Sequence, residues 1–286
     1  MADTERSLAL LDTVRRSGVL SETSMQALKK VDPARKLTLG EPANQHKEEN
    51  VLLVATLVDD SGSLNVAVER DPKTERRTSR SASCDDPKSN AEAVRIGHNA
   101  VIQALQESAK PSTIWFHTRY LKGYELNSWN QLERVTRMDR SNFRPDGGTP
   151  LYDETVAILG SVITKTQEFR NHWVQVRTAT LIVTDGEDTE SRLQTPTSVK
   201  NVVIDMYNMG IHIIVAMGID DGKTDFRKVF IEMGIHENLI LTPGNTPDEI
   251  RKAFGLFGKM ASRAIDPRRF NNMLTGGFLA LPKGGS

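Results

Sequence analysis

Three short clusters of carboxylate, hydroxyl and glycine residues could do chemistry in this chain. They occupy residues 59–63 (DDSGS), 146–150 (DGGTP) and 185–188 (DGED). The first and third clusters each follow an apolar run directly, and none of the three contains a histidine or a cysteine. Carboxylate and hydroxyl oxygens are hard ligands, which suit Mg²⁺, Mn²⁺ or Ca²⁺ better than zinc or copper. The clusters therefore predict a site for a divalent cation.

The spacing of the first cluster places three oxygen-bearing side chains on one side of the backbone. In an extended or turning segment alternate side chains face the same way, so Asp59, Ser61 and Ser63 can converge on one ion. Gly62 removes a side chain that would crowd the turn, and the two glycines at 147–148 let another segment of backbone approach closely. We therefore expect the three side chains to share one cation.

Continuous apolar runs alternate with helical patterns along most of the chain. The runs predict strands at 51–58, 112–120, 178–184, 211–217 and 238–242, and the patterns predict helices at 90–109, 150–170, 196–209, 224–234 and 246–263. Such an alternation is typical of an α/β fold, with a doubly wound, mostly parallel central sheet covered by helices on both faces. In a sheet of this kind ligands bind beyond the carboxyl ends of the strands, which is where the three clusters fall.

Local signals mark several helix starts and one edge strand. Residues 89–92 and 246–249 both fit the capping box, and Thr149-Pro150 predicts an N-cap hydroxyl followed by proline at the first helical position. Residues 121–129 are too short for a crossover helix, so they predict a hairpin that leads into a small antiparallel edge strand.

The ends of the chain and one internal segment differ from this alternating part. Residues 1–49 predict a helical N-terminal extension, with two short amphipathic helices within 6–31 and a polar linker after them. Residues 50–263 form the predicted main domain, and 264–286 form a C-terminal tail. Within the domain, residues 65–88 are charged, rich in serine and nearly free of large apolar residues, which indicates an exposed, mobile loop.

The composition excludes several broad classes of function. The chain has 37 basic and 37 acidic residues, so it carries no overall charge that would attract nucleic acid. Its single cysteine, Cys84, cannot form an internal disulfide, and no apolar run approaches the ~20 residues that a membrane span needs. The N-terminus has acidic residues before a short apolar patch and lacks a signal-peptide pattern. We therefore expect a cytoplasmic protein that binds neither a membrane nor nucleic acid.

Three motifs, DDSGS at 59–63, GGTPLYD at 147–153 and VTDGED at 183–188, resemble in type and order the three loops of a von Willebrand factor A (vWA) domain. In that family the loops form the metal-ion-dependent adhesion site (MIDAS) on a Rossmann-like fold. The resemblance covers about residues 50–263 and includes the order of strands and helices. Members of the family usually enter the first helix soon after the serines, whereas residues 64–89 intervene here.

The resemblance implies a role for each residue of a complete MIDAS. Ser61 and Ser63 would bind the metal directly, and Thr149 would bind it directly or through water. Asp59 and Asp185 would act mostly through water or by hydrogen-bonding the ligands. The remaining coordination position would be filled by an Asp or Glu of a partner protein, because few carboxylates touch the ion and its charge stays only partly neutralised.

The resulting hypothesis is a protein–protein interaction module that depends on Mg²⁺, or on Mn²⁺ or Ca²⁺, and is not an enzyme. By analogy with the family, the chain would be a subunit of a cytoplasmic multi-protein assembly, with an ATPase or other subunits as candidate partners. One alternative is a Mg²⁺-dependent phosphoryl hydrolase that uses Asp59. Another is a scaffold subunit whose metal site is vestigial and whose terminal helices make the contacts.

Overall fold

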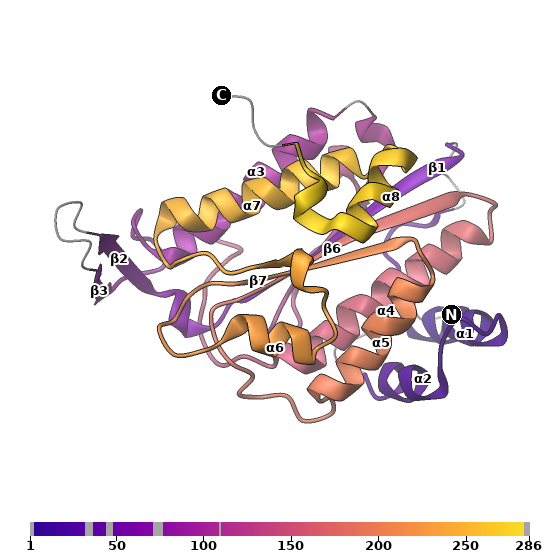
Figure 1. Cartoon of the computed structure of the whole chain (residues 1–286), viewed down its shortest axis with the longest axis horizontal. Coiled ribbons are helices and arrows are strands. Elements are labelled where there is room, and N and C mark those ends of the chain that lie inside the picture. The colour runs from indigo at the N-terminus through magenta and orange to yellow at the C-terminus, as the bar shows by residue number, and fades with distance from the viewer. Residues whose placement is uncertain (1–2, 32–36, 44–47, 71–76, 109, 283–286) are drawn as a thin grey trace.

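A six-stranded sheet forms the centre of the molecule (Figure 1). The computed structural model describes residues 3–31, 37–43, 48–70, 77–108 and 110–282. In their order across the sheet, the strands are β5 (Glu125–Gln131), β4 (Ile114–Tyr120), β1 (Asn50–Val58), β6 (Gln175–Thr184), β7 (His212–Gly218) and β8 (Ile240–Leu241). β5 is antiparallel to β4, and every other neighbouring pair is parallel. The predicted, mostly parallel sheet with one antiparallel edge strand is thus confirmed.

Helices cover both faces of this sheet (Figure 1). On one face lie α3 (Asn90–Gln106), α7 (Pro247–Arg263) and α8 (Pro267–Gly276), and on the other lie α4 (Leu151–Arg170), α5 (Pro196–Asn208) and α6 (Phe226–Glu232). The N-terminal helices α1 (Asp3–Arg16) and α2 (Glu22–Lys29) pack against α4 and α5. The predicted α/β fold is therefore confirmed. Among the described residues, no helix is both long enough and apolar enough to cross a membrane.

The central strands are buried on both sides, which explains their continuous apolar sequences. All residues of β4 and β7 are buried, and in β1 only Asn50 is exposed. One contact between covering helices needs a glycine, because a β-carbon on Gly97 of α3 would lie 2.3 Å from the ring of Phe254 in α7. Ser89 and Thr246 cap the N-termini of α3 and α7, and these caps fix where the two helices begin. The predicted capping box is complete at α7, whereas at α3 only the Ser89 side chain makes its half of the pair.

The chain changes its winding direction between β1 and β6. The connection after β1 leads to β4 on one side, whereas the connection after β6 leads through α5 to β7 on the other. The loops that leave β1 and β6 therefore diverge at the carboxyl edge of the sheet, and residues 59–63 and 185–188 lie in these two loops. In doubly wound sheets such a switch point is the usual place for a ligand.

The prediction of a loop over 65–88 is wrong for part of the residues that the structure describes there, whereas residues 82–88 contain neither helix nor strand. The described residues of this segment include two antiparallel strands, β2 (Val66–Arg70) and β3 (Arg77–Ser81), which form a separate two-stranded ribbon (Figure 1). Ala67 is buried, although the segment contains few apolar residues. The short apolar run Val66–Val68 is enough for a strand, because pairing with β3 supplies the backbone hydrogen bonds. Residues 71–76, at the centre of the predicted loop, lie outside the described part of the chain.

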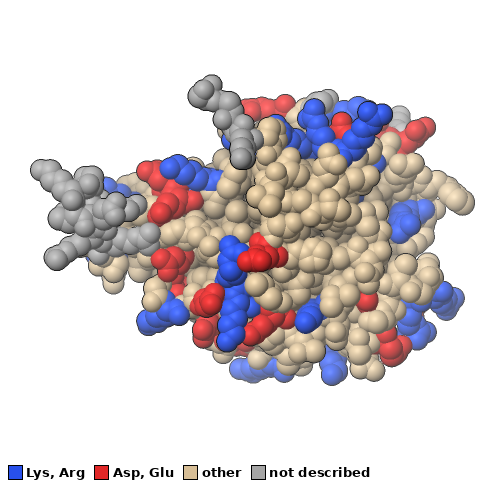
Figure 2. Space-filling model, viewed as in Figure 1, with Lys and Arg blue, Asp and Glu red and all other residues tan. Residues whose placement is uncertain are grey.

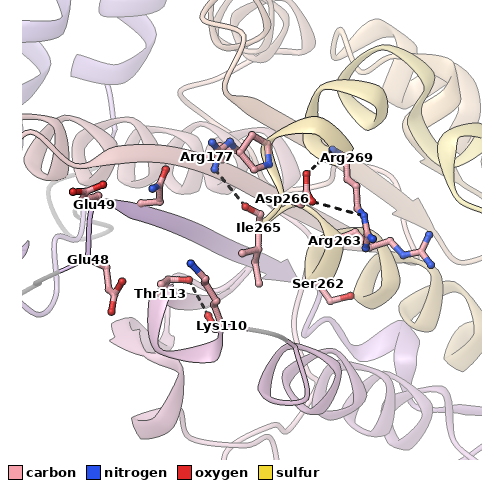
Figure 3. A pocket seen from close by; sticks show the side chains of 12 residues that line it. Glu48, Glu49, Lys110, Thr113, Arg177, Ser262, Arg263, Ile265, Asp266 and Arg269 are labelled. Carbon is pink, nitrogen blue, oxygen red and sulfur yellow. Dashed lines mark hydrogen bonds and ion pairs between the residues drawn. The ribbon is translucent and has the colours of Figure 1, made fainter.

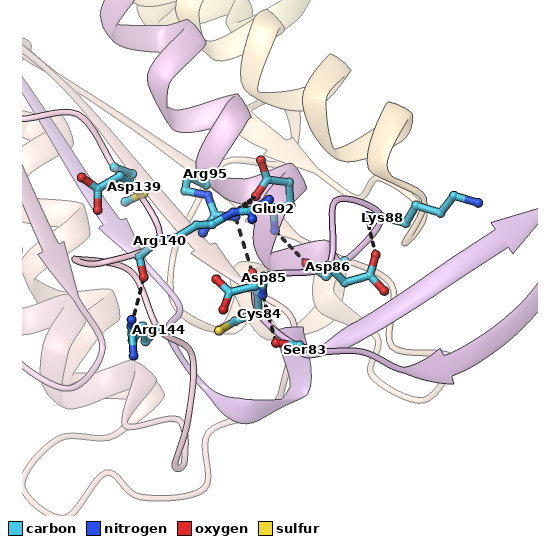
Figure 4. Close-up of polar contacts among 12 residues, drawn as sticks. Ser83, Cys84, Asp85, Asp86, Lys88, Glu92, Arg95, Asp139, Arg140 and Arg144 are labelled. Carbon is cyan, nitrogen blue, oxygen red and sulfur yellow. Dashed lines mark hydrogen bonds and ion pairs between the residues drawn. The ribbon is translucent and has the colours of Figure 1, made fainter.

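The segment that follows this ribbon is bound to the start of α3 (Figure 4). Arg95 of α3 is buried, donates to the carbonyl of Cys84 at 3.4 Å and forms an ion pair with Glu92. Asp86 forms a 2.7 Å ion pair with Arg80 of β3. These contacts tie the ribbon to the helix, so the inserted segment has a defined position where it joins the main fold.

Two N-terminal helices are present as predicted, but the described part of the expected linker is packed against the main fold. Leu37 and Leu39 are buried. The ammonium group of Lys165 in α4, itself fully buried, donates to the Leu39 carbonyl at 2.8 Å. Apolar residues at alternate positions give this short segment a buried side, which its otherwise polar composition hides. The rest of the expected linker, residues 32–36 and 44–47, lies outside the described part of the chain.

The expected C-terminal tail contains helix α8 and one turn of 3₁₀-helix (Gly277–Ala280). Phe270 and Met273 of α8 are buried against the rest of the molecule. The helix begins where Asp266 caps the first turn and Pro267 occupies the first helical position, a common start signal. The prediction of a C-terminal tail over 264–286 is therefore wrong for residues 267–280, which form α8 and the 3₁₀-helix.

Candidate functional site

The loops that carry the first two polar clusters are joined by backbone hydrogen bonds. The N–H of Gly62 donates to the carbonyl of Gly147 at 3.2 Å, and the N–H of Asp146 donates to the carbonyl of Asp60 at 2.8 Å. A β-carbon on Gly62 would find the backbone of residues 146–147 within 4 Å, so the two loops lie in close contact. The second cluster is thus held beside the first, as the glycine-rich sequences predict.

Hydroxyl and carboxylate side chains from the first and third clusters converge at one point. The hydroxyl oxygens of Ser61 and Ser63 lie 2.7 Å apart. Both hydroxyls reach Oδ1 of Asp185, Ser63 at 2.7 Å and Ser61 at 3.4 Å. The alternate spacing of the two serines therefore does bring them to the same side of the loop. Three of the five predicted site residues share one set of hydrogen bonds.

Asp59 lies beneath this group and organises the backbone of both loops. Its Oδ1 accepts from the N–H of Ser61 at 2.8 Å, and its Oδ2 accepts from the hydroxyl of Thr184 at 2.7 Å and from the N–H of Asp185 at 3.3 Å. Burial raises the pKa of Asp59, and these hydrogen bonds to the carboxylate act in the opposite direction. Asp59 thus holds the two loops together by bonds to its charged form.

The carboxylate of Asp185 is buried, and it lies close to the carboxylate of Asp59. Burial, and then the negative charge of Asp59, raises the pKa of Asp185 to about 7. Among the described residues, no lysine or arginine forms an ion pair with either carboxylate. Two buried carboxylates with no basic side chain between them favour a cation, because a cation removes both the desolvation cost and the repulsion.

Thr149 lies at the edge of this group. It is buried, and its backbone pairs with Thr189, its N–H donating to the Thr189 hydroxyl at 3.0 Å and its carbonyl accepting at 2.9 Å. The Thr149 hydroxyl oxygen lies 3.7 Å from the position of a β-carbon on Gly186. Within the described residues, no hydrogen bond joins this hydroxyl to the other four predicted ligands. The structure therefore brings Thr149 to the third loop but not into the hydrogen-bonded set.

The prediction that Thr149 caps helix α4 is wrong. Pro150 occupies the N-cap position and has no side-chain donor or acceptor to offer. Instead, the N–H of Tyr152 in the first turn donates to Asp188 at 3.2 Å and to the Ser191 hydroxyl at 3.0 Å. Because residues of the third loop satisfy this helix end, the hydroxyl of Thr149 is not committed to capping.

Two residues near the site were not identified from the sequence. Thr184 ends β6 and donates to Asp59, as described above, and it stands inside the VTDGED motif. Lys122 lies beside Asp60, in the turn between β4 and β5. Its backbone N–H donates to Oδ1 of Asp60 at 3.1 Å, and its ammonium group lies 3.7 Å from Oδ2 of the same carboxylate. Burial raises the pKa of Asp60 to about 6 although Lys122 opposes the shift. Nothing in the turn sequence marks Lys122 as a neighbour of the first cluster.

The described residues contain no group of three or more His, Cys, Asp or Glu side chains arranged to hold a metal ion. The candidate site therefore differs from a carboxylate-rich or imidazole-rich centre. Its oxygen donors are two carboxylates and the hydroxyls of serine and threonine. The hydroxyls are neutral ligands, and both kinds of oxygen suit hard cations.

No family model matches this sequence, and no curated protein matches it. Among solved structures, the chain is similar to the pilus adhesin SpaC of Lactobacillus rhamnosus GG, with 13% identity and a TM-score of 0.48. That match covers 77% of this chain and 32% of the SpaC chain, so this chain spans about a third of the length of SpaC.

Two further similar structures are named after the von Willebrand factor domain. One is a von Willebrand factor type A structure from Catenulispora acidiphila, with 13% identity, a TM-score of 0.44 and coverage of 77% of this chain and 43% of that one. The other is the vWF domain of the type V pili tip protein Mfa5 from Porphyromonas gingivalis, with 10% identity, a TM-score of 0.47 and coverage of 77% and 98%. These are likenesses of fold, and no functional assignment follows from them.

Proposed function

We propose that this chain is a divalent-metal-dependent protein-interaction module of the vWA type. The observation that carries the proposal is the convergence of Ser61, Ser63 and Asp185, whose oxygens lie 2.7 to 3.4 Å apart at the switch point of a parallel sheet. The set is hydroxyl-rich, largely buried and without a basic partner among the described residues. Such a set suits a hard divalent cation.

In this proposal each of the five residues has a defined task. Ser61 and Ser63 hold Mg²⁺, or Mn²⁺ or Ca²⁺, through their hydroxyls, and Thr149 holds it directly or through water. Asp59 and Asp185 orient these groups and neutralise part of the positive charge. The bound cation supplies a Lewis-acidic position that a carboxylate can occupy. An Asp or Glu of the partner protein completes the site.

The proposed partner is a protein within a multi-protein assembly. The chain would act there as a subunit in the cytoplasm, and an ATPase is one candidate for another subunit. A nucleic acid is not part of the proposal. Figure 2 shows acidic and basic residues interspersed over one face of the molecule, without a continuous patch of basic residues. A membrane is not part of the proposal either.

We propose further that the chain is not an enzyme, because Asp59 is poorly placed to attack a phosphoryl group. Its side chain is 1% exposed, and both of its oxygens accept hydrogen bonds, Oδ1 from Ser61 and Oδ2 from Thr184 and Asp185. A nucleophilic carboxylate needs an oxygen that faces its substrate. This arrangement favours binding over the alternative of a phosphoryl hydrolase.

Isothermal titration calorimetry with Mg²⁺ and with Mn²⁺ tests the metal site directly. It compares the wild type, the double variant Ser61→Ala/Ser63→Ala, and the matched control Ser83→Ala/Ser141→Ala, which removes two exposed hydroxyls outside the site. We expect the site variant to lose about tenfold or more in metal affinity and the control to bind as the wild type does. Equal affinity in the three proteins would contradict the proposal.

A second experiment tests the partner. Immobilised wild type and the Ser61→Ala/Ser63→Ala variant are exposed to native lysate of the source cells, with Mg²⁺ or with EDTA. A protein retained only by wild type with Mg²⁺ supports metal-bridged binding, and exchange of its candidate Asp and Glu residues for Asn and Gln should abolish the retention. Equal retention in all arms would favour the scaffold alternative, in which the terminal helices make the contacts.

A further inference from the structure

Helix α4 ends in a conformation that its residues do not favour. The N–H of Trp173 donates to the carbonyl of Arg170 at 3.0 Å, and the N–H of Val174 donates to that of Phe169 at 3.2 Å. This is the Schellman pattern, which places one residue in the left-handed region, where glycine is usual. That residue here is Trp173, with a φ of 63°. A residue with a β-carbon is strained in this conformation.

The indole of Trp173 receives no packing from the rest of the chain that would offset this strain. It is 94% exposed, whereas Trp115 and Trp129 are 2% and 0% exposed. A large apolar side chain kept in water on a strained backbone is unfavourable in the free protein. Both features indicate that Trp173 serves a contact made outside this chain.

A groove of about 490 Å³ lies beside Trp173. Its apolar lining includes the buried residues Val176 and Phe270, and its polar lining includes Arg170 and Arg177. No Asp or Glu is among the described residues that line it. The described lining of the groove therefore combines apolar side chains with two arginines.

The two arginines of this groove have few partners in the described part of the chain. Arg177 makes one long hydrogen bond, 3.5 Å, to the carbonyl of Ile265, and neither Arg170 nor Arg177 forms an ion pair with a described residue. Arg177 also lines an adjoining pocket of about 690 Å³ (Figure 3). That pocket contains acidic residues, including Asp266, whose carboxylate accepts from backbone N–H groups of α8. Arg177 therefore lies between a groove without acidic lining residues and a pocket that contains them.

We propose that this groove binds an acidic peptide segment of a partner protein, one that carries an aromatic or large apolar residue. The carboxylates of the segment pair with Arg170 and Arg177, and its apolar side chain packs on Trp173. Neither arginine forms an ion pair with a described residue, although the negative charge of Asp266 acts on Arg177. Tryptophan and arginine are the residue types that carry most of the binding energy in protein interfaces.

This surface is separate from the candidate metal site. The groove is formed where β6 and β7 begin, whereas Asp185 follows the end of β6 at the opposite edge of the sheet. The inference therefore does not depend on the proposed metal function. A partner on this surface and a partner on the metal could bind at the same time.

The probe is a dye-labelled synthetic peptide with one central Phe and several Glu on each side, and fluorescence anisotropy on the full chain reports its binding. We expect Trp173→Gly, and separately Arg170→Ala/Arg177→Ala, to weaken binding by about tenfold or more. Two control variants remove an exposed aromatic residue and an exposed arginine elsewhere, Tyr124→Ala and Arg227→Ala, and should bind as the wild type does. The fluorescence of Trp173 provides a second readout, because the other two tryptophans are buried.

Three further arms decide the chemistry of the ligand. A peptide with Ala in place of Phe should bind more weakly, and one with Lys in place of Glu should not bind.

The melting temperature of Trp173→Gly should be no lower than that of the wild type, which shows that the variant is folded. An unchanged anisotropy of a trace amount of labelled peptide at about 1 mM protein, or equal affinity in Trp173→Gly, would overturn the proposal. Binding of oligothymidylate instead of the peptide would assign the groove to single-stranded nucleic acid and would also overturn it.

Discussion

The hydroxyl of Ser63 donates a 2.7 Å hydrogen bond to Oδ1 of Asp185, although 122 positions separate the two residues in the chain. Ser63 lies in the loop after β1 and Asp185 in the loop after β6, so this bond joins the two loops that diverge at the switch point. It requires that β1 and β6 be neighbours, with Val58 paired to Val183 at their ends. The candidate site is therefore a product of sheet topology as much as of its own residues.

Replacement of Asp185 by Asn should stabilise the protein in the absence of metal. Asp185 is 5% exposed, and its negative charge lies near that of Asp59. The Asp185→Asn change keeps the shape of the side chain and removes this buried repulsion. We expect the free energy of unfolding in EDTA, near pH 8, to rise by ~1–3 kcal/mol. Urea unfolding followed by circular dichroism measures this change.

The same variant should no longer respond to Mg²⁺. For a dissociation constant of ~0.1 mM, about 1 mM Mg²⁺ adds ~1.4 kcal/mol to the stability of the wild type by mass action. Asp185→Asn should gain none of this, whereas Asp248→Asn, at an exposed position in α7, should respond as the wild type does. An Asp185→Asn protein that is less stable in EDTA and still stabilised by Mg²⁺ would argue against a cation at this place.

The burial of His212 should make stability depend on pH. Burial lowers the pKa of His212 to about 3, and its Nδ1 lies 2.8 Å from the hydroxyl of Thr178. In the unfolded chain the pKa is about 6.5. Because the folded-state pKa is depressed, the stability that depends on neutral His212 is complete above pH ~6.5. It is lost as the pH falls toward about 3, by up to ~1.4 kcal/mol per pH unit.

The variant His212→Asn isolates this contribution, because asparagine does not titrate. The difference in unfolding free energy between the wild type and His212→Asn should narrow by ~1.4 kcal/mol per unit as the pH falls below about 6.5. A comparison is needed because burial raises the pKa of Asp60 to about 6. The contribution of Asp60 to stability changes with pH in the opposite direction to that of His212. It is lost as the pH rises through the folded-state pKa of Asp60. Urea unfolding at several pH values gives both curves, and parallel curves would refute the prediction.

The sheet and the polar loops at its carboxyl edge could be predicted because local patterns determine them. Apolar runs mark the buried strands, and alternate spacing brings Ser61 and Ser63 to one side of the first loop. The order of strands and helices then places Asp185 at the same edge. These features can be predicted without knowing which side chains from distant parts of the sequence are in contact.

The contacts that the sequence did not reveal depend on tertiary neighbours. Lys122 reaches Asp60 across 62 positions, and the first turn of α4 is satisfied by Asp188 and Ser191 instead of by Thr149. No local pattern encodes either contact, because each arises when two connections meet at the end of the sheet. The same reason explains why the sequence predicts a linker around Leu39, where the structure has a short packed segment: its partners are on α4.

Replacement of Lys165 by Met should destabilise the whole fold. The Lys165 ammonium is fully buried and donates to the Leu39 carbonyl and to Glu168, both at 2.8 Å. In Lys165→Met these acceptors lose their buried donor, and we expect a loss of ~3 kcal/mol in the free energy of unfolding. Lys200→Met, at an exposed position, serves as the control and should change stability by less than ~0.5 kcal/mol. A similar effect of both variants in urea unfolding would show that the packed segment contributes nothing.

Replacement of Trp173 by glycine should make the free protein more stable, contrary to the usual effect of removing a tryptophan. The residue has a φ of 63°, and its side chain is 94% exposed, so glycine relieves backbone strain without removing buried contacts. Relief of the left-handed strain is worth ~1–2 kcal/mol, and the extra freedom of glycine in the unfolded chain offsets ~0.4–1 kcal/mol of it. We expect a net gain of up to ~1.6 kcal/mol in urea unfolding. Trp173→Ala keeps a β-carbon and should show no such gain. If the two variants are equally stable, the left-handed conformation carries no strain, and the position of Trp173 needs no functional explanation.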